Sequence, residues 1–163
     1  MVVLVCLAAG WAMLDIAQPY DAHIDHRLRT EPIIWFGTST SRGQPHLVPM
    51  WFLWDGARVL LFSLPNTRKL RDVAANTAVV LALEAADQGY DIVILEGRAR
   101  LLNDPDATPL MPAFIAKYAD IPRRWSAEEW AQRFSKTIQV TPTKLRGWIT
   151  KPGVPPEQRS LTF

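Results

Sequence analysis

The segment from Tyr90 to Leu102 constrains the fold more than any other stretch of the sequence. In its second half, small and apolar residues alternate with charged residues, which is the period-two pattern of a strand with one buried face. The apolar face carries Leu95, Gly97, Ala99 and Leu101, and the charged face carries Glu96, Arg98 and Arg100. In the first half, residues 92–95 are apolar on both faces. We therefore expect a helix or a second subunit to cover the other face there.

Five further segments have strand character, at residues 33–40, 46–54, 58–63, 78–84 and 137–143. Asp55-Gly56 is the strongest hairpin signal in the chain, because a tight hairpin turn needs positive φ angles that glycine tolerates. Pro49 lies inside the second of these segments and cannot donate to a ladder, so we expect a bulge or a sheet edge there.

Four segments have helical character. Apolar residues recur at helical spacing in 16–29, a second helix follows Pro65-Asn66 and runs to about Asn76, and a third lies near 109–119. Ser126 and Glu129 form a capping box for the fourth. Six short strands with intervening helices and no alternating strand–helix rhythm predict an α+β barrel, not a doubly wound sheet.

The start of the second helix carries an unusual charge pattern. Asn66 or Thr67 can cap it, but its first turn holds Arg68, Lys69 and Arg71, where acidic residues are expected. Free backbone N–H groups, a hydroxyl group and several cations together suit a phosphate or carboxylate ligand. The alternative, a solvated basic helix face, is about as common for such a charge run.

A second candidate is the segment Val48-Pro49-Met50-Trp51. A bulged strand frees backbone groups that can bond the polar edge of a planar ring, while Met50 or Trp51 packs on the ring face. The alternative for Met50 and Trp51 is simple core packing, which is the more common role of aromatic residues in strands.

Other chemistries lack their residues in this sequence. His23, Asp25 and His26 share one helix, but only His46 is available as a further ligand, so we expect no metal site. No G-x-S-x-G, G-x-G-x-x-G or P-loop motif occurs. The net charge of +2 is too small to predict nucleic-acid binding. The lone Cys6 excludes an intrachain disulfide and fits a cytoplasmic protein.

Three regions are expected along the chain. Residues 1–14 form an uncharged apolar leader that is too short to span a membrane and lacks the basic start of a secretory signal, and translation beginning at Met13 would explain it. Residues 15–150 form one cofactor-binding domain. Residues 151–163 form an extended tail that is rich in proline.

The order of these features resembles the pyridoxamine 5′-phosphate oxidase-like split β-barrel family, over about residues 15–150. The segments that carry the resemblance are Gln44 to Phe52, Trp54-Asp55-Gly56, a strand ending at Ser63, Thr67 to Asn76, and Glu96-Gly97-Arg98-Ala99. Within the family, the chain most resembles the branch that uses the deazaflavin coenzyme F420. The FMN-using oxidases typically have arginine where this chain has Val48 and Asn-Pro where it has Asn76-Thr77.

The resemblance implies a six-stranded antiparallel split β-barrel of the FMN-binding type, with flanking helices. It also implies a homodimer with two cofactor sites at the subunit interface, and no side chain that acts as an essential base. The cofactor ring would lie on the second and third strands, and the phosphate by the start of the helix. The residues that the resemblance assigns to cofactor binding are Val48, Pro49, Met50, Trp51, Ser63, Thr67, Arg68, Lys69 and Arg71.

The resulting hypothesis is an oxidoreductase that transfers a hydride between reduced F420 and a small conjugated substrate. An FMN-dependent oxidoreductase of the same fold is the first alternative. A non-catalytic barrel that carries a cofactor, or binds single-stranded RNA through its aromatic and arginine side chains, is the second. We expect a small-molecule substrate, no membrane partner and a cytoplasmic protein.

Overall fold

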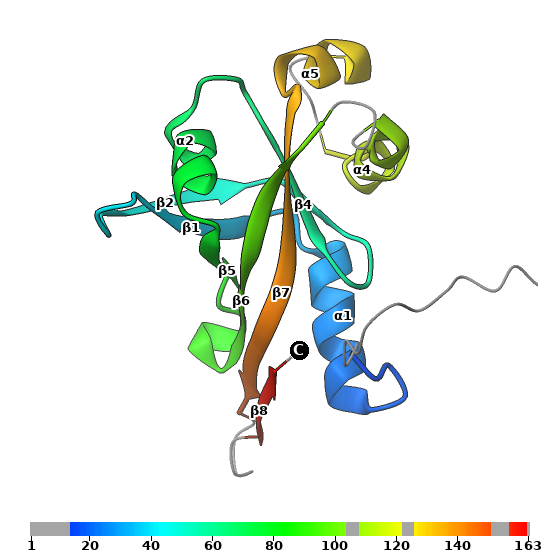
Figure 1. Cartoon of the computed structure of the whole chain (residues 1–163). Helices are drawn as coiled ribbons and strands as arrows, with labels where there is room; N and C mark the ends of the chain where they lie inside the picture. The colour runs from blue at the N-terminus through cyan, green and yellow to red at the C-terminus, as the bar shows by residue number, and fades with distance from the viewer. Residues whose placement is uncertain (1–13, 104–107, 122–125, 151–156, 163) are drawn as a thin grey trace, which may run out of the picture.

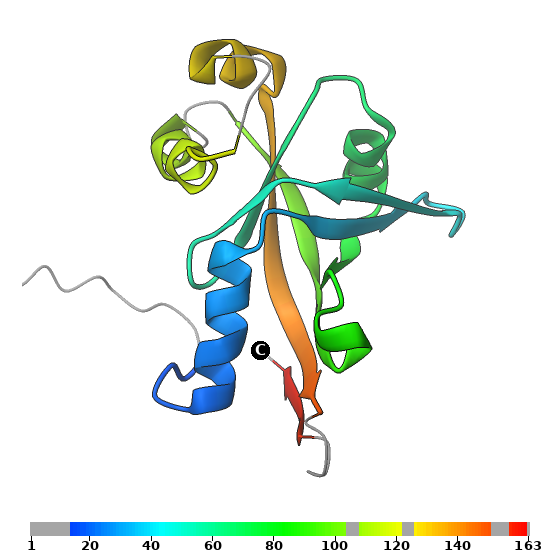
Figure 2. The same ribbon diagram turned by 180° about the vertical axis from the view of Figure 1, so that it is seen from behind.

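A computed structural model describes residues 14–103, 108–121, 126–150 and 157–162 of the chain. It is an α+β structure built on one antiparallel sheet (Figures 1 and 2). The sheet comprises β1 (Ile34–Ser39), β2 (Pro45–Met50), β3 (Phe52–Trp54), β4 (Val59–Ser63), β5 (Ala78–Leu83), β6 (Asp91–Leu102), β7 (Lys136–Ile149) and β8 (Glu157–Thr162). Its order is β2-β1-β5-β6-β7-β4-β3, and β8 also pairs with β7.

The α-helices of the described part are α1 (Pro19–Thr30), α2 (Arg68–Ala75), α4 (Met111–Lys117) and α5 (Ala127–Arg133). Short 3-10 turns, η1 (Asp87–Gly89) and η2 (Thr108–Leu110), precede β6 and α4. In both views α2 lies beside β1 and β2, whereas α4 and α5 gather at the far end of the sheet (Figures 1 and 2). The capping box of Ser126 and Glu129 is present at the start of α5, as predicted.

Six strands were expected, and the described residues form eight. The predicted strand over residues 46–54 is two strands, because pairing stops at Trp51: β2 pairs with β1, whereas β3 pairs with β4. Since β2 and β3 form the two ends of the sheet order, this one segment requires the sheet to curl back on itself. Pro49 lies in an edge strand, which is one of the two positions expected for it. The eighth strand lies in the segment expected to be an extended tail.

Strand β7 is longer than the predicted 137–143. Pro142 does not end it, because the β6–β7 register shifts there: Glu96 pairs with Lys144 and Gly97 with Pro142, which leaves Thr143 as the extra residue of a bulge. The Thr143 hydroxyl bonds the Glu96 carbonyl at 3.3 Å. Pairing then continues to Ile149.

The alternation predicted in β6 holds through Arg100 and then changes. Leu95 and Ala99 are buried, but Leu101 is 44% exposed and Leu102 is buried instead. The phase changes because Leu102 packs into an aromatic cluster between β4 and the helices α4 and α5. In the first half of β6, Val93 is buried and Ile92 and Ile94 are half-buried.

Helix α1 covers the buried face of the sheet with Tyr20, Ile24 and Leu28. A polar network ties it to the sheet. The Arg27 guanidinium donates to the Asp91 carboxylate at 2.7 Å and to the Glu84 carbonyl at 2.6 Å, while His23 Nε2 lies 2.7 Å from the same carboxylate. His23 therefore helps to attach helix α1 to the sheet through the Asp91 carboxylate.

The aromatic cluster attaches α4 through Tyr118. Its side chain is 1% exposed, and its hydroxyl accepts a hydrogen bond from the Phe52 N–H at 2.8 Å. The same hydroxyl lies 2.9 Å from the carbonyl oxygens of Pro32 and Phe52. The ring stacks on Trp51 with centroids 4.5 Å apart.

We predict that Tyr118→Phe lowers the free energy of unfolding by about 1–3 kcal/mol, because it leaves the buried Phe52 N–H without an acceptor. Urea denaturation followed by circular dichroism measures this. Tyr90→Phe is the matched control, since Tyr90 is 53% exposed. Equal stabilities for the two variants would contradict the assignment.

Candidate functional site

The start of helix α2 has no acidic residue in its first turn and no side-chain cap. Thr67 occupies the N-cap position, but its hydroxyl lies 3.0 Å from Ser63 Oγ at the end of β4 and does not bond the helix N–H groups. The left-handed backbone of Asn66 (φ 63°) turns the chain from β4 into the helix. The first turn therefore presents N–H groups that no side chain of the described residues caps.

The three cations of this turn differ in their surroundings. Arg68 donates to the Pro45 carbonyl at 3.3 Å and lies 3.5 Å from the Asp72 carboxylate. Arg71 is exposed and donates to the Asn66 carbonyl at 2.9 Å. Lys69 is half-buried, and burial lowers its pKa. Among the described residues it has no ion-pair partner, so its ammonium group is available to an anion.

Four of the nine sequence-predicted residues lie in or beside the break between β2 and β3. Val48 is half-buried against the core, Pro49 is exposed and Met50 is buried. Trp51 packs in the aromatic cluster on Tyr118 and Trp130. For Met50 and Trp51 this is the core packing that the sequence also allowed.

The structure brings the other five residues together. Ser63 ends β4, and its contact with Thr67 places it at the base of the α2 turn that carries Arg68, Lys69 and Arg71. Two features connect this group to the β2–β3 segment. Arg68 bonds the carbonyl of Pro45 in β2. The pairing of Phe52 with Leu61 also directs the end of β2 toward the Ser63 end of β4.

Sequence reasoning missed a buried polar cluster that joins α2 to the sheet. The carboxylate of Asp72, which is 4% exposed, accepts a hydrogen bond from the Thr38 hydroxyl at 2.9 Å. It lies 3.8 Å from His46 Nδ1, and Thr38 Oγ1 lies 3.5 Å from the same nitrogen. The sequence shows Asp72 only as an acid near a basic run, because its partners come from strands that are distant in the chain.

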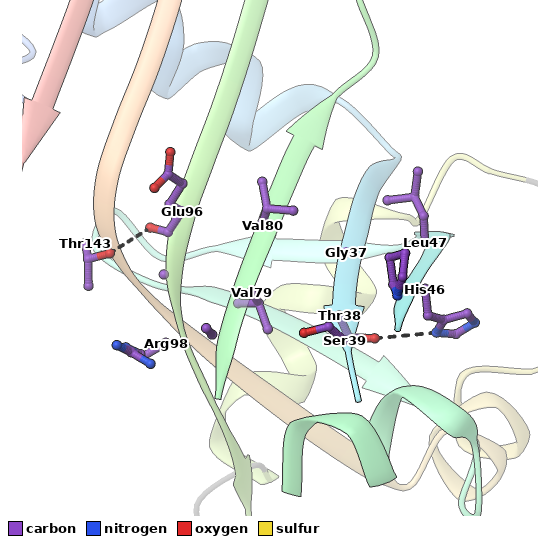
Figure 3. A pocket seen from close by; sticks show the side chains of 13 residues that line it. Gly37, Thr38, Ser39, His46, Leu47, Val79, Val80, Glu96, Arg98 and Thr143 are labelled. Carbon is purple, nitrogen blue, oxygen red and sulfur yellow. Dashed lines mark hydrogen bonds between the residues drawn. The ribbon is translucent and has the colours of Figure 1, made fainter. Parts of the chain in front are cut away.

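Beside this cluster a pocket of about 800 Å³ opens on the sheet between β2, β1, β5, β6 and the bulge of β7. Figure 3 shows Thr38, Ser39, His46 and Leu47 on one side of it and Glu96 and Thr143 on the other. Val79 and Val80 of β5 lie between them (Figure 3). The pocket combines an apolar floor with polar margins, and its volume is typical of sites for small molecules and cofactors.

None of the nine predicted residues lines this pocket. The pocket nevertheless adjoins them. Pro45 and His46 line it and come shortly before Val48 in strand β2, and the Pro45 carbonyl accepts the hydrogen bond from Arg68. The candidate site is therefore a basic helix start next to a larger pocket. No local sequence pattern predicts the pocket, because four strands and the β7 bulge contribute to it.

The residues that the structure describes contain no group of three or more histidine, cysteine, aspartate or glutamate residues placed to hold a metal ion. None of the helices described is both long enough and apolar enough to cross a membrane.

Comparisons with known proteins agree with this fold. No curated protein matches the chain. Protein Rv2991 from Mycobacterium tuberculosis has a similar structure, with a TM-score of 0.68 and 22% identity over 82% of this chain and 88% of that one. The general stress protein 26 of Bacillus anthracis has a TM-score of 0.60 and 17% identity over 86% and 97%. A structure described as an F420 reductase has a TM-score of 0.56 and 22% identity over 74% and 94%.

These identities are low, so the structural matches establish a shared fold and nothing finer. The sequence profile described as pyridoxamine 5′-phosphate oxidase matches residues 20–149, which is most of the chain. The described domain of this protein, with its curled antiparallel sheet and its basic α2 start, belongs to the pyridoxamine 5′-phosphate oxidase family, as the sequence resemblance predicted.

Proposed function

We propose that this chain is an oxidoreductase that transfers a hydride between the reduced deazaflavin coenzyme F420 and a small conjugated substrate. The observation that carries the proposal is the uncapped start of α2, where the half-buried Lys69 has no ion-pair partner among the described residues. Such a site suits the anionic tail of a cofactor. The family is named for an oxidase, which supports redox chemistry.

The residues present fit such a cofactor. Lys69 and the first N–H groups of α2 would hold the phosphate, and Arg68 is already oriented by Pro45 and Asp72. The cofactor would supply the hydride chemistry when bound. The protein would then bind and orient the cofactor and exclude water from it. The valine floor of the adjoining pocket favours the exclusion of water. No side chain is assigned as a catalytic base.

FMN is the alternative cofactor, because the family takes its name from pyridoxamine 5′-phosphate oxidase. Val48 argues for F420. It stands where the FMN-using oxidases resembled by this sequence have arginine, and in the structure it is half-buried against the core, so this position of β2 provides no cation.

We predict that Lys69→Glu weakens cofactor binding by about 1–3 kcal/mol, the size of a lost charge-assisted contact. Titration calorimetry with F420 measures the change. Arg58→Glu provides the matched charge reversal, since Arg58 is partly exposed and precedes β4, whereas the site lies at the other end of that strand. Unchanged affinity in the Lys69 variant would refute the proposed anion site.

The cofactor itself is tested by competition. We expect purified protein that is incubated with equal amounts of FMN and F420 to retain F420, as read from the absorbance spectrum after gel filtration. The loaded protein should then reduce a conjugated substrate in an anaerobic assay. Retention of FMN would favour the alternative cofactor, and binding without turnover of any substrate tested would favour a carrier role.

We also propose that the protein is a homodimer. The register places Trp35, Leu47, Val80, Ala82 and Ile94 on one outer face of the sheet, which no described helix covers. Leu47 is 59% exposed and Val80 is 42% exposed. Leu47 and Val80 of this face also line the pocket, so a second copy seated on the face would complete the walls of the site.

We predict that Val80→Glu converts the dimer to a monomer, because it places a charge in the centre of this apolar face. Sedimentation velocity measures the mass. Leu101→Glu is the control, since Leu101 is equally exposed but lies outside this face. A monomeric wild-type protein would contradict the proposal.

A further inference from the structure

Strand register sets which side chains face the pocket beside the basic helix start. Gly37 of β1 pairs with Val80 of β5, and Ala78 of β5 pairs with Arg98 of β6. Ser39 lies two residues beyond Gly37 and therefore on the same face of β1. All five residues line the pocket. Because neighbouring strands lie about 4.8 Å apart, Ser39 and Arg98 come from strands about 10 Å apart, on either side of β5 (Figure 3).

The floor between these two polar residues is apolar and low. A Cβ atom at Gly37 would lie 2.6 Å from Val80 Cγ1 and 3.7 Å from Leu47 Cδ1, so glycine keeps this part of the floor free of a side chain. Ala78 is exposed and contributes only a methyl group. A low apolar floor of this kind suits the face of a planar apolar ligand.

The acidic groups in and beside the pocket are engaged within the protein. Glu96 forms an ion pair with Arg146 at 2.9 Å. The Asp72 carboxylate accepts the hydrogen bond from Thr38 at 2.9 Å and lies 3.8 Å from Nδ1 of His46, which also lines the pocket. Neither carboxylate is therefore available to a further cation of the pocket.

Arg98 and Ser39 retain hydrogen-bond donors. Arg98 is exposed, and the one polar contact of its side chain among the described residues is to the Thr77 hydroxyl, at 3.4 Å. Since a guanidinium group has five N–H donors, most of them remain available. Ser39 Oγ accepts a hydrogen bond from Asn76 Nδ2 at 2.9 Å, and its own hydrogen has no acceptor among the residues described. The pocket thus presents a positively charged group of donors on one side and a hydroxyl group on the other.

We propose that this pocket binds planar conjugated carboxylates, and that these are the substrate class of the proposed oxidoreductase. The Arg98 guanidinium binds the carboxylate, because its planar fork matches two carboxylate oxygens and its single charge matches that of the ligand. Gly37, Ala78 and Val80 carry the conjugated body, and the Ser39 hydroxyl is available to a polar substituent at the opposite end. The assignment as substrate rests on the proposed function, whereas the binding of the carboxylate does not.

Equilibrium dialysis of the full-length protein at neutral pH tests the role of Arg98. The two probes are cinnamate and cinnamamide, which share a planar body and differ in charge. We expect the wild-type protein to bind cinnamate on the order of tenfold more tightly, the effect of one charge-assisted contact. Arg98→Gln should abolish this preference. Arg100→Gln is the matched control, since Arg100 is an exposed arginine on the same face of β6 outside the pocket. A preference that Arg98→Gln does not alter would overturn the proposal.

A second variant tests the floor separately from the charge. Ala78→Leu fills the space between Ser39 and Arg98 and should weaken the binding of cinnamate and cinnamamide alike. Ala74→Leu is its control, because Ala74 is exposed on α2 and does not line the pocket. Unchanged affinities in the Ala78 variant would overturn the role of the floor.

Repeating the dialysis in the presence of saturating F420 separates this inference from the proposed function. Cinnamate binding that F420 leaves unchanged supports a substrate site beside the cofactor, and competition between the two ligands would overturn it. If F420 does not bind, the proposed function fails, and the assignment as substrate fails with it. The preference of the unloaded protein for cinnamate still decides whether the pocket binds carboxylates.

Discussion

The structure depends on the interruption of pairing at Trp51. One continuous segment forms both β2 and β3, and these strands lie at opposite ends of the sheet order. The sheet can satisfy both pairings only by curling, which creates the half-open barrel and its core. The side chain of Trp51 then leaves the sheet and stacks on Tyr118, so the break is stabilised by aromatic packing where ladder hydrogen bonds are lost.

The same break organises the candidate site. It brings the end of β2 near the Ser63 end of β4, from which the chain turns into α2. The buried Asp72 attaches that helix to β1 and β2 through Thr38 and His46, and Arg68 attaches it to Pro45. The helix backbone that carries Lys69 is therefore held against β1 and β2, although the Lys69 side chain has no ion-pair partner among the residues described. An unpaired cation on a fixed backbone suits anion binding, because the backbone needs no reordering when the ligand arrives.

Much of the fold follows from local sequence. The alternation in residues 95–99, the Asp55-Gly56 turn and the capping box at Ser126 are local signals, and each predicted element is present. The predictions are wrong where residues distant in the sequence determine where a strand ends. The break at Trp51 depends on aromatic partners from α4 and α5, and the continuation of β7 past Pro142 depends on its bulge opposite Gly97. Likewise, the charge pattern of α2 is visible in the sequence, whereas the pocket and the Asp72 cluster require strands to be assembled first.

The two prolines of β2 have a consequence for the outer border of the sheet. Pro45 and Pro49 are four residues apart, so their nitrogens face the same side of an edge strand, and neither bears a hydrogen. Of the three backbone nitrogens on that side of β2, only Leu47 offers a donor. A strand of another molecule would meet few N–H donors at this edge. The edge therefore disfavours aggregation by strand pairing between molecules. The proposed homodimer would accordingly use a broad face of the sheet, where association can end at a closed pair.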